Sequence, residues 1–251
     1  MPWSLFFAIL NDMSKHSKWA KIKRQKGVAD VKKGNVFTKL GNAIAIAARA
    51  GADPESNFKL RLTIDKARTH NMPNDTIERA IARGSGKADG QTIEEMLYEG
   101  FGPGGITVMV EATTDNTNRT VNDLKRVLQD HGGRLGGPNS VARMFERKGI
   151  ITIPKTTFNT DMELALIDAG AEDIASHDET IITTSPQTLE AVRQACVKNN
   201  IKPTDVALEW IPKEFAPIAD EKKESVKAFF EALDALDDVQ EWYANVDIDT
   251  L

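Results

Sequence analysis

The amino-acid sequence predicts a multidomain chain of mixed α and α+β class, with a helical N-terminal part followed by two α+β domains. Three observations support this fold class. The chain has 251 residues, which is more than one compact core usually needs. Its hydrophobic fraction of 41% and charged fraction of 27% are those of an ordinary globular protein. The hydrophobic period is helical before the turn-rich segment GSGKADGQ (84–91) and alternating after it.

Three short amphipathic helices are predicted before this segment. The first covers 35–51. The second covers 53–71 and begins with Asp53 as N-cap before a proline, which is a favoured helix start. The third covers 74–84, with Asn74 as N-cap and a glycine at its end. Because each helix has a single apolar stripe, the three can bury these stripes only by packing together or on a neighbour. We therefore expect a three-helix bundle.

Strands and helices are predicted to alternate after the turn-rich segment. The expected elements are a strand at 106–112, a helix at 117–133, a hairpin turning at Lys148-Gly149, a helix at 161–170, strands at 172–176 and 180–185, a helix at 186–200, a strand at 205–211, a helix at 221–238 and a strand at 239–248. This order is typical of ferredoxin-like units, in which helices cover one face of an antiparallel sheet.

The last helix and strand are expected to complete the first sheet, so that a middle segment forms an inserted domain. The strand at 150–153 fits either sheet. The predicted domains are a helical one at 13–89, a discontinuous α+β one at 90–150 and 213–251, and an inserted α+β one at 151–212. We interpret residues 1–12 as an upstream extension and Met13 as the natural start.

Composition also bears on the compartment. The apolar run near the N-terminus is far shorter than the roughly 20 residues of a spanning helix, and it lacks the basic flank of a signal peptide. The single cysteine, Cys196, allows no disulfide within the chain, and its helical spacing with apolar neighbours indicates a core residue. These features favour a cytoplasmic protein.

The charge is distributed unevenly along the chain. Residues 1–90 hold 17 Lys or Arg against 8 Asp or Glu, whereas residues 91–251 hold 15 against 29. The total of −5 therefore hides a head of +9 on a body of −14. Such asymmetry indicates a local site for a polyanion.

The positive charge is densest in SKHSKWAKIKRQKGVADVKKG (14–34), where nine basic residues, counting one histidine, accompany one acid. Trp19 is the only aromatic residue in this segment, and its ring can stack on a base. We predict that this basic arm binds nucleic acid through backbone phosphates. The predicted contact residues are Lys15, His16, Ser17, Lys18, Trp19, Lys21, Lys23, Arg24, Lys26, Lys32, Lys33 and Lys39.

Cations on the three predicted helices would continue this basic surface, although each alone is more simply explained as a solvated side chain. They are Lys39, Arg49, Lys59, Arg61, Lys66, Arg68, Arg79 and Arg83.

Two further motifs suggest loops that contact a partner or rRNA. YEGFGPGG (98–105) lacks the Gly-Lys-Ser/Thr ending of a phosphate-binding P-loop, so it is interpreted as a tight turn. In TTDNTNRT (113–120), Asn116 or Asn118 can cap the following helix, and Arg119 near the helix start needs a partner or an anion. The residues in question are Tyr98, Glu99, Gly102, Pro103, Gly104, Asn116, Asn118 and Arg119.

Catalysis and metal binding have little support. The four histidines show no ligand spacing, and adjacent acids such as Asp237-Asp238 suit a solvated surface. No pairing of a nucleophile with a base can be argued from the sequence. We therefore expect no enzyme, no metal and no cofactor.

Several long motifs occur together in a characteristic order. MSKHSKWAKIKRQKG, GKADGQTIEEMLYEGFGPGGITVMVE, TDNTNRT and SVARMFERKG resemble the YebC/PmpR family of probable transcriptional regulators and translational activators, over about residues 13–251. The resemblance implies three domains, one of them discontinuous, in a cytoplasmic, cofactor-free protein of gene expression. It implies action either on promoter DNA or on translating ribosomes, including relief of stalling on proline-rich stretches.

The expected function is therefore that of a non-enzymatic nucleic-acid-binding regulator. Its expected partners are DNA or ribosomal RNA, with the transcription machinery or the ribosome, and neither a membrane nor a small-molecule substrate. The alternative is a protein-interaction adaptor whose acidic α+β domains bind a basic partner.

Overall fold

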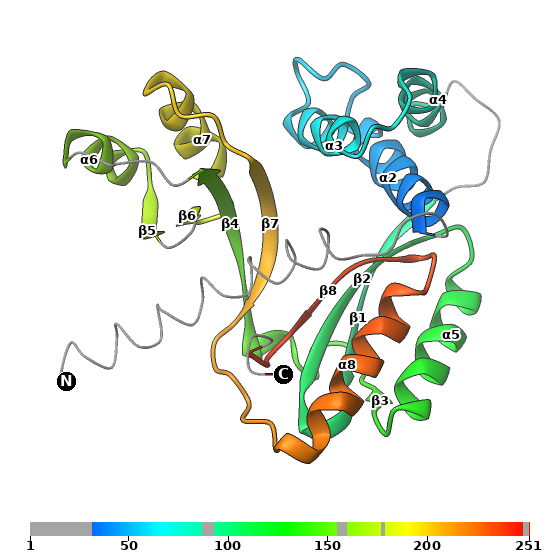
Figure 1. The fold of residues 1–251 in the computed structure, drawn as a ribbon. Helices are drawn as coiled ribbons and strands as arrows, with labels where there is room; N and C mark the ends of the chain where they lie inside the picture. Colours follow the sequence, from blue (N-terminus) through cyan, green and yellow to red (C-terminus); the bar gives the residue numbers. More distant parts are fainter. Residues whose placement is uncertain (1–31, 87–92, 155–159, 177–178, 248–250) are drawn as a thin grey trace. The chain divides into compact units, whose positions relative to one another are not determined.

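The computed structural model of the chain describes residues 32–86, 93–154, 160–176, 179–247 and 251. Seven α-helices and two four-stranded antiparallel sheets lie within these residues (Figure 1). N-terminal helices are followed by α+β structure, which confirms the predicted fold class. The described residues form two compact units. The larger unit contains everything up to Arg143 together with 214–246, and the smaller unit runs from Met144 to Lys213. The three-domain division with the boundaries given above stays a prediction.

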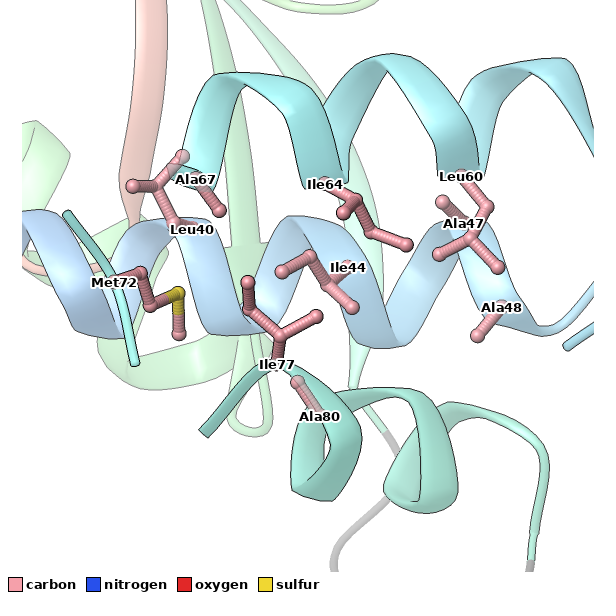
Figure 2. Packing of buried hydrophobic residues seen from close by; sticks show 10 residues of the cluster. All are labelled: Leu40, Ile44, Ala47, Ala48, Leu60, Ile64, Ala67, Met72, Ile77 and Ala80. Carbon is pink, nitrogen blue, oxygen red and sulfur yellow. The ribbon is translucent and has the colours of Figure 1, made fainter. Parts of the chain in front are cut away.

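The N-terminal helices of the larger unit are α2 (Lys32–Ala48), α3 (Phe58–Thr69) and α4 (Asn74–Gly84). Figure 2 shows that side chains from α3 and α4 point toward α2, which lies between them. Their shared core consists of small and branched apolar residues, namely Leu40, Ile44, Ala47, Ala48, Leu60, Ile64, Ala67, Met72, Ile77 and Ala80. The alanines let the helices approach closely, so the three short helices are stabilised by one another.

Two predicted helix caps are wrong. Asp53 begins a separate turn, in which its backbone carbonyl accepts from the N–H of Asn57 at 3.0 Å. Asn57 is the cap of α3, since its side-chain oxygen accepts from the N–H of Leu60 at 3.1 Å. Helix α4 has Pro73 as its N-cap residue, with no side-chain cap, and Asn74 is its first helical residue. An Asp-Pro pair favours a helical turn but does not decide whether that turn continues into the helix.

The first sheet belongs to the larger unit and has the strand order β3-β1-β2-β8. Its strands are β1 (Glu94–Phe101), β2 (Thr107–Thr114), β3 (Arg134–Leu135) and β8 (Val239–Ala244). Helices α5 (Thr117–Asp130) and α8 (Asp220–Asp234) lie side by side along one face of the sheet (Figure 1). Gly100 on β1 meets Leu128 of α5, while Trp242 on β8 stacks on Phe230 of α8 at 4.0 Å between ring centroids.

Strand β1 is absent from the sequence prediction. It lies at the centre of the sheet, paired with β2 along its full length and with β3 at Gly100 and Phe101. Its sequence, EEMLYEGF, begins with two exposed glutamates and contains a buried glutamate and a glycine. These residues hide the strand alternation, because Glu99 is buried by a contact that only the tertiary structure supplies.

The second sheet forms the smaller unit and has the strand order β5-β6-β4-β7. Its elements are β4 (Phe145–Pro154), α6 (Thr160–Asp168), β5 (Ala171–Ser176), β6 (Glu179–Thr184), α7 (Leu189–Lys198) and β7 (Asp205–Pro212). The chain order is β-α-β-β-α-β, and all neighbouring strands of the sheet are antiparallel. This is the ferredoxin-like arrangement.

The predicted hairpin at Lys148-Gly149 is wrong, because both residues lie inside the continuous strand β4. Segment 150–153 pairs with β6 and most of it also with β7, so it belongs to the second sheet. A Cβ at Gly149 would lie 2.9 Å from the side chain of Leu189. The same Cβ would collide with the side chain of Thr184 on β6, so the glycine is required by the close approach of β6 and α7 and not by a turn.

None of the helices in the described part of the chain is both long and apolar enough to cross a membrane.

Candidate nucleic-acid interface

The predicted nucleic-acid-binding residues fall largely in the arm. Nine of them, from Lys15 to Lys26, lie outside the described residues. Lys32 and Lys33 begin helix α2, and their side chains also fall outside what the structure describes. The arm therefore leads directly into the first helix of the bundle. Lys39 is the one member of the predicted set whose side chain is described.

Lys39 lies on α2 and points into the molecule. Its Nζ donates to the backbone carbonyl of Asp234, at the end of α8, over 3.1 Å. Burial lowers the pKa of this ammonium, while the nearby carboxylates of Glu241 and Asp237 act in the opposite direction. The lysine therefore joins the helical bundle to the α+β part of the larger unit.

Two lysines of α3 make similar contacts. Lys59 pairs with Glu95 at the start of β1 over 2.8 Å, and Lys66 pairs with Glu241 of β8 over 3.0 Å. The side chains of the first pair are 62% and 55% exposed, and those of the second are 36% and 42% exposed. Ion pairs this exposed contribute about 0.2–1 kcal/mol each to stability. They therefore hold the lysines only weakly, and the ammonium groups can exchange one anionic partner for another.

The other helix cations also have partners within the molecule. Arg49 donates to the carbonyl of Ile93, Arg61 donates to the carbonyls of Pro54 and Glu55, Arg68 pairs with Asp65, Arg79 pairs with Asp75, and Arg83 donates to Asn42. All eight predicted helix cations thus have a partner within the chain, and four of them, Lys59, Lys66, Arg68 and Arg79, pair with carboxylates. The sequence could not reveal these partners, because five of the contacts join residues at least 36 positions apart.

Tyr98 and Glu99 lie on strand β1 and not in a loop as expected, and Glu99 has a structural role. Its carboxylate accepts from the backbone N–H groups of Asn139 and Val141, both at 2.6 Å, and of Ala142 at 2.8 Å. Burial alone would raise the pKa of Glu99, but the three hydrogen bonds together outweigh it and hold the pKa below its ordinary value. The buried carboxylate fixes the loop that leads into β4, so it is not available to a partner.

Tyr98 and Gly102 of the YEGFGPGG motif are also buried, whereas Gly104 is exposed. The Tyr98 ring is buried, and burial followed by the charges of Asp238 and Glu94 raises the pKa of its hydroxyl. Pro103 and Gly104 form a 3₁₀ turn in which Gly104 has φ of 72°. A Cβ at Gly102 would lie 2.9 Å from Ile106 and Phe229. The residues from Gly102 to Gly104 form a tight turn packed against α8, as the composition of the motif indicated.

The TTDNTNRT motif caps α5 and anchors a distant segment. Of the two predicted cap residues, Asn116 is the cap, because its side-chain oxygen accepts from the N–H of Arg119 at 3.1 Å. Asn118 is exposed and lies in the first turn of the helix. The guanidinium of Arg119 pairs with Asp115 at 2.9 Å and with Asp238 at 3.0 Å. The anion that the arginine needs is therefore supplied by the chain itself.

Asp238 is a site that the sequence reasoning missed. The interpretation of Asp237-Asp238 as a solvated pair is wrong for Asp238, whose side chain is 16% exposed. Besides the arginine, its carboxylate accepts from the hydroxyls of Thr120 at 2.7 Å and Thr114 at 3.2 Å. Two adjacent acids point in different directions, so one reaches solvent and the other the helix start.

A cleft of about 710 Å³ lies in the larger unit where the bundle meets α5 and the turn from α8 to β8. Its charged lining is Arg83, Arg119, Asp115, Asp123, Asp237 and Asp238. Both arginines already bond to groups of the chain, so the carboxylates are in excess. A phosphate backbone would be repelled there, and the cleft is no part of the candidate interface.

Among the described residues, no cluster of three or more His, Cys, Asp or Glu side chains could hold a metal ion.

Comparison with known proteins agrees with the motifs quoted above. The family model for the N-terminal domain of TACO1/YebC proteins matches residues 17–87, and the model for the TACO1/YebC second and third domain matches residues 93–246. A protein of Pseudothermotoga lettingae named a probable transcriptional regulatory protein is 43% identical over 94% of this chain and 95% of its own length. A protein of the same name from Chloroflexus aggregans is 45% identical over 95% of this chain and 97% of its own length.

A solved structure also matches the fold. The crystal structure of Aq1575, a conserved hypothetical protein from Aquifex aeolicus, superposes with a TM-score of 0.77 at 40% identity. The match covers 86% of this chain and 91% of that one.

Proposed function

The chain belongs to the TACO1/YebC family, and on this premise we propose that it is a non-enzymatic regulator of gene expression that binds nucleic acid through its basic arm. Relatives along nearly the whole chain are named probable transcriptional regulatory proteins, which supports a regulatory role. The observation that carries the nucleic-acid proposal is the charge of the arm, eight Lys or Arg and one acid within residues 14–34 of a chain whose total is −5.

Two observations support placing the proposed contact on the arm. The helix cations from Lys39 to Arg83 have partners inside the molecule, and the excess carboxylates lie beyond residue 91. The densest positive charge without matching acids, eight Lys or Arg against one acid, therefore belongs to residues 14–34. A segment of this kind gains affinity by releasing the cations condensed on a phosphate backbone, and this gain does not depend on base sequence.

DNA and ribosomal RNA both fit this chemistry, and the arm adds one feature that favours unpaired bases. Trp19 lies among the arm lysines, and stacking of a base on an aromatic ring contributes about 1–3 kcal/mol. We therefore propose a transcriptional or translational regulator whose arm contacts either promoter DNA or exposed rRNA, in the cytoplasm and without a cofactor. A comparison of duplex DNA with single-stranded RNA, for the parent and for Trp19→Ala, separates the two targets.

The test is a charge-neutralised arm in the full-length protein. Lys18, Lys21, Lys23, Arg24 and Lys26 are replaced together by Ala, and the affinity for a labelled RNA oligonucleotide and for duplex DNA is measured at several salt concentrations. The matched control carries the same loss of charge on exposed lysines of the acidic body, namely Lys125, Lys198, Lys202, Lys213 and Lys222.

We expect the arm variant to bind more weakly than the parent. Its slope of log affinity against log salt concentration should be shallower by about 0.7 per lost phosphate contact on RNA and by about 0.9 on duplex DNA. The control is expected to keep the slope of the parent. An arm variant with the affinity and slope of the parent would overturn the proposal. In that case, protein partners that remain in a pull-down after nuclease treatment would favour the adaptor.

A further inference from the structure

Three lysines of the helical bundle are held by groups of the α+β part of the larger unit. They are Lys39 with the Asp234 carbonyl, Lys59 with Glu95, and Lys66 with Glu241. We call these three contacts the helix-to-sheet clasp. Two of them are exposed ion pairs in which a glutamate carboxylate binds the lysine ammonium group, as a phosphate oxygen would.

The bundle depends little on the sheet for its own packing. Its ten-residue core is drawn entirely from α2, α3, α4 and the connection between the last two. An apolar cluster that joins α2 to the residue before β1 has three buried members, Ala45, Ile46 and Ile93. The contact between bundle and sheet is thus rich in polar and ionic bonds, and such contacts between parts of a chain open more readily than an apolar core does.

The spacing of the clasp lysines suits an extended polyanion. Lys59 and Lys66 lie seven residues apart on α3, which is about 10.5 Å along the helix axis. A nucleic-acid strand presents a phosphate about every 3.4 Å along its duplex axis, so this distance spans about three phosphates. The helix that carries these lysines packs on α2, into which the basic arm leads.

We propose that Glu95 and Glu241 act as internal phosphate mimics, which occupy Lys59 and Lys66 in the free protein and yield them to a sugar–phosphate backbone once the arm has bound it. This inference rests on the proposed function and adds a second contact surface to it. The exchange is close to balanced, because an exposed carboxylate pair is weak and a phosphate contact gains the release of counterions. The arm supplies the initial affinity, and α3 then adds contacts that an incorrectly placed polymer does not reach.

The experiment compares three variants of the full-length protein with the parent. The clasp variant is Glu95→Gln with Glu241→Gln, which keeps side-chain shape and removes both carboxylate charges. The charge control is Glu221→Gln with Glu231→Gln, two exposed glutamates of α8. The lysine variant is Lys59→Ala with Lys66→Ala. Binding of the same RNA and duplex DNA is measured between about 50 and 200 mM salt, and folding is checked by urea unfolding.

We expect the clasp variant to bind about two- to thirtyfold more tightly than the parent, the ratio that follows from releasing two exposed ion pairs. The charge control is expected to stay within about twofold of the parent, because its carboxylates lie away from the lysines and are screened. For the lysine variant, the slope of log affinity against log salt concentration is expected to be shallower than that of the parent. The expected difference is up to about 1.4 on RNA, or about 1.8 on duplex DNA. This last result does not require the clasp variant to fold.

Failure of the inference differs from failure of the proposed function. An unchanged salt slope in the lysine variant, or equal affinities for the clasp variant and the charge control, overturns the inference while a weakened arm variant still supports the function. An arm variant that binds as the parent does overturns the proposed function. A parent that binds neither polymer overturns both.

Discussion

Arg119 and Asp238 lie 119 positions apart in the chain, and the guanidinium of the first bonds both carboxylate oxygens of the second at 3.0 Å. The contact joins the first turn of α5 to the residue before β8. It therefore attaches the last strand of the first sheet to a helix formed more than a hundred residues earlier. The hydroxyl of Thr120 at 2.7 Å completes the site.

Replacing Asp238 by Ala is expected to lower the free energy of unfolding by about 1–3 kcal/mol, because Thr120 and the arginine lose a charged acceptor. Urea unfolding followed by tryptophan fluorescence measures the change. The control is Asp237→Ala, whose side chain is exposed and whose loss is expected to stay within about 0.5 kcal/mol. Equal unfolding midpoints for the two variants would contradict the anchoring role of Asp238.

Replacing Glu99 by Gln is expected to destabilise the protein by about 2–4 kcal/mol at neutral pH, since one amide oxygen cannot serve three backbone N–H groups as a carboxylate does. The midpoint of urea unfolding at neutral pH checks this. The variant Glu95→Gln, on the same strand but exposed, is the matched control.

The same residue predicts a pH dependence. The pKa of Glu99 is lower in the folded protein than its ordinary value of 4.5, so its contribution is complete above that value and is lost as the pH falls toward the folded pKa. The difference in stability between the parent and Glu99→Gln should therefore be constant down to about pH 5 and shrink below it. A difference that stays constant or grows on acidification would show that the carboxylate is not stabilised by folding.

Cys196 is expected to be unreactive in the folded protein. The thiol is fully buried, and burial raises its pKa to about 11. At pH 7 about one molecule in 10⁴ then carries the thiolate, which is the reactive form. A chromogenic disulfide reagent should react with the folded protein far more slowly than with the protein unfolded in urea. Comparable rates in the two states would place the thiol at the surface.

Gly84 is expected to tolerate no side chain. A Cβ there would collide with the backbone carbonyl of Ala45, where α4 crosses α2. The substitution Gly84→Ala should destabilise the bundle by about 1–3 kcal/mol, because backbone must shift to make room. The control is Gly137→Ala, which has open space around the added methyl group and is expected to change stability little. Circular dichroism during thermal unfolding would measure both.

Much of the fold was predictable because its elements have clear hydrophobic periods. The helices around Ile44, Leu124 and Phe229 have apolar stripes that all became buried. The failures share one cause, which is that some residues serve a distant contact. Glu99 resembles a polar surface residue but is buried by the loop at 139–142, so β1 was missed. Gly149 resembles a turn residue but makes room for Thr184 and Leu189.

The candidate site divides in the same way. The basic arm and the motif order are local properties, so the sequence alone determined them, and it narrowed the cap of α5 to Asn116 or Asn118. The pairing of Lys59 with Glu95 and of Lys66 with Glu241 was decided only by the tertiary structure. The physical reason is that charge and periodicity are carried by each residue and its near neighbours, whereas an ion pair between distant residues exists only after packing has brought their elements together.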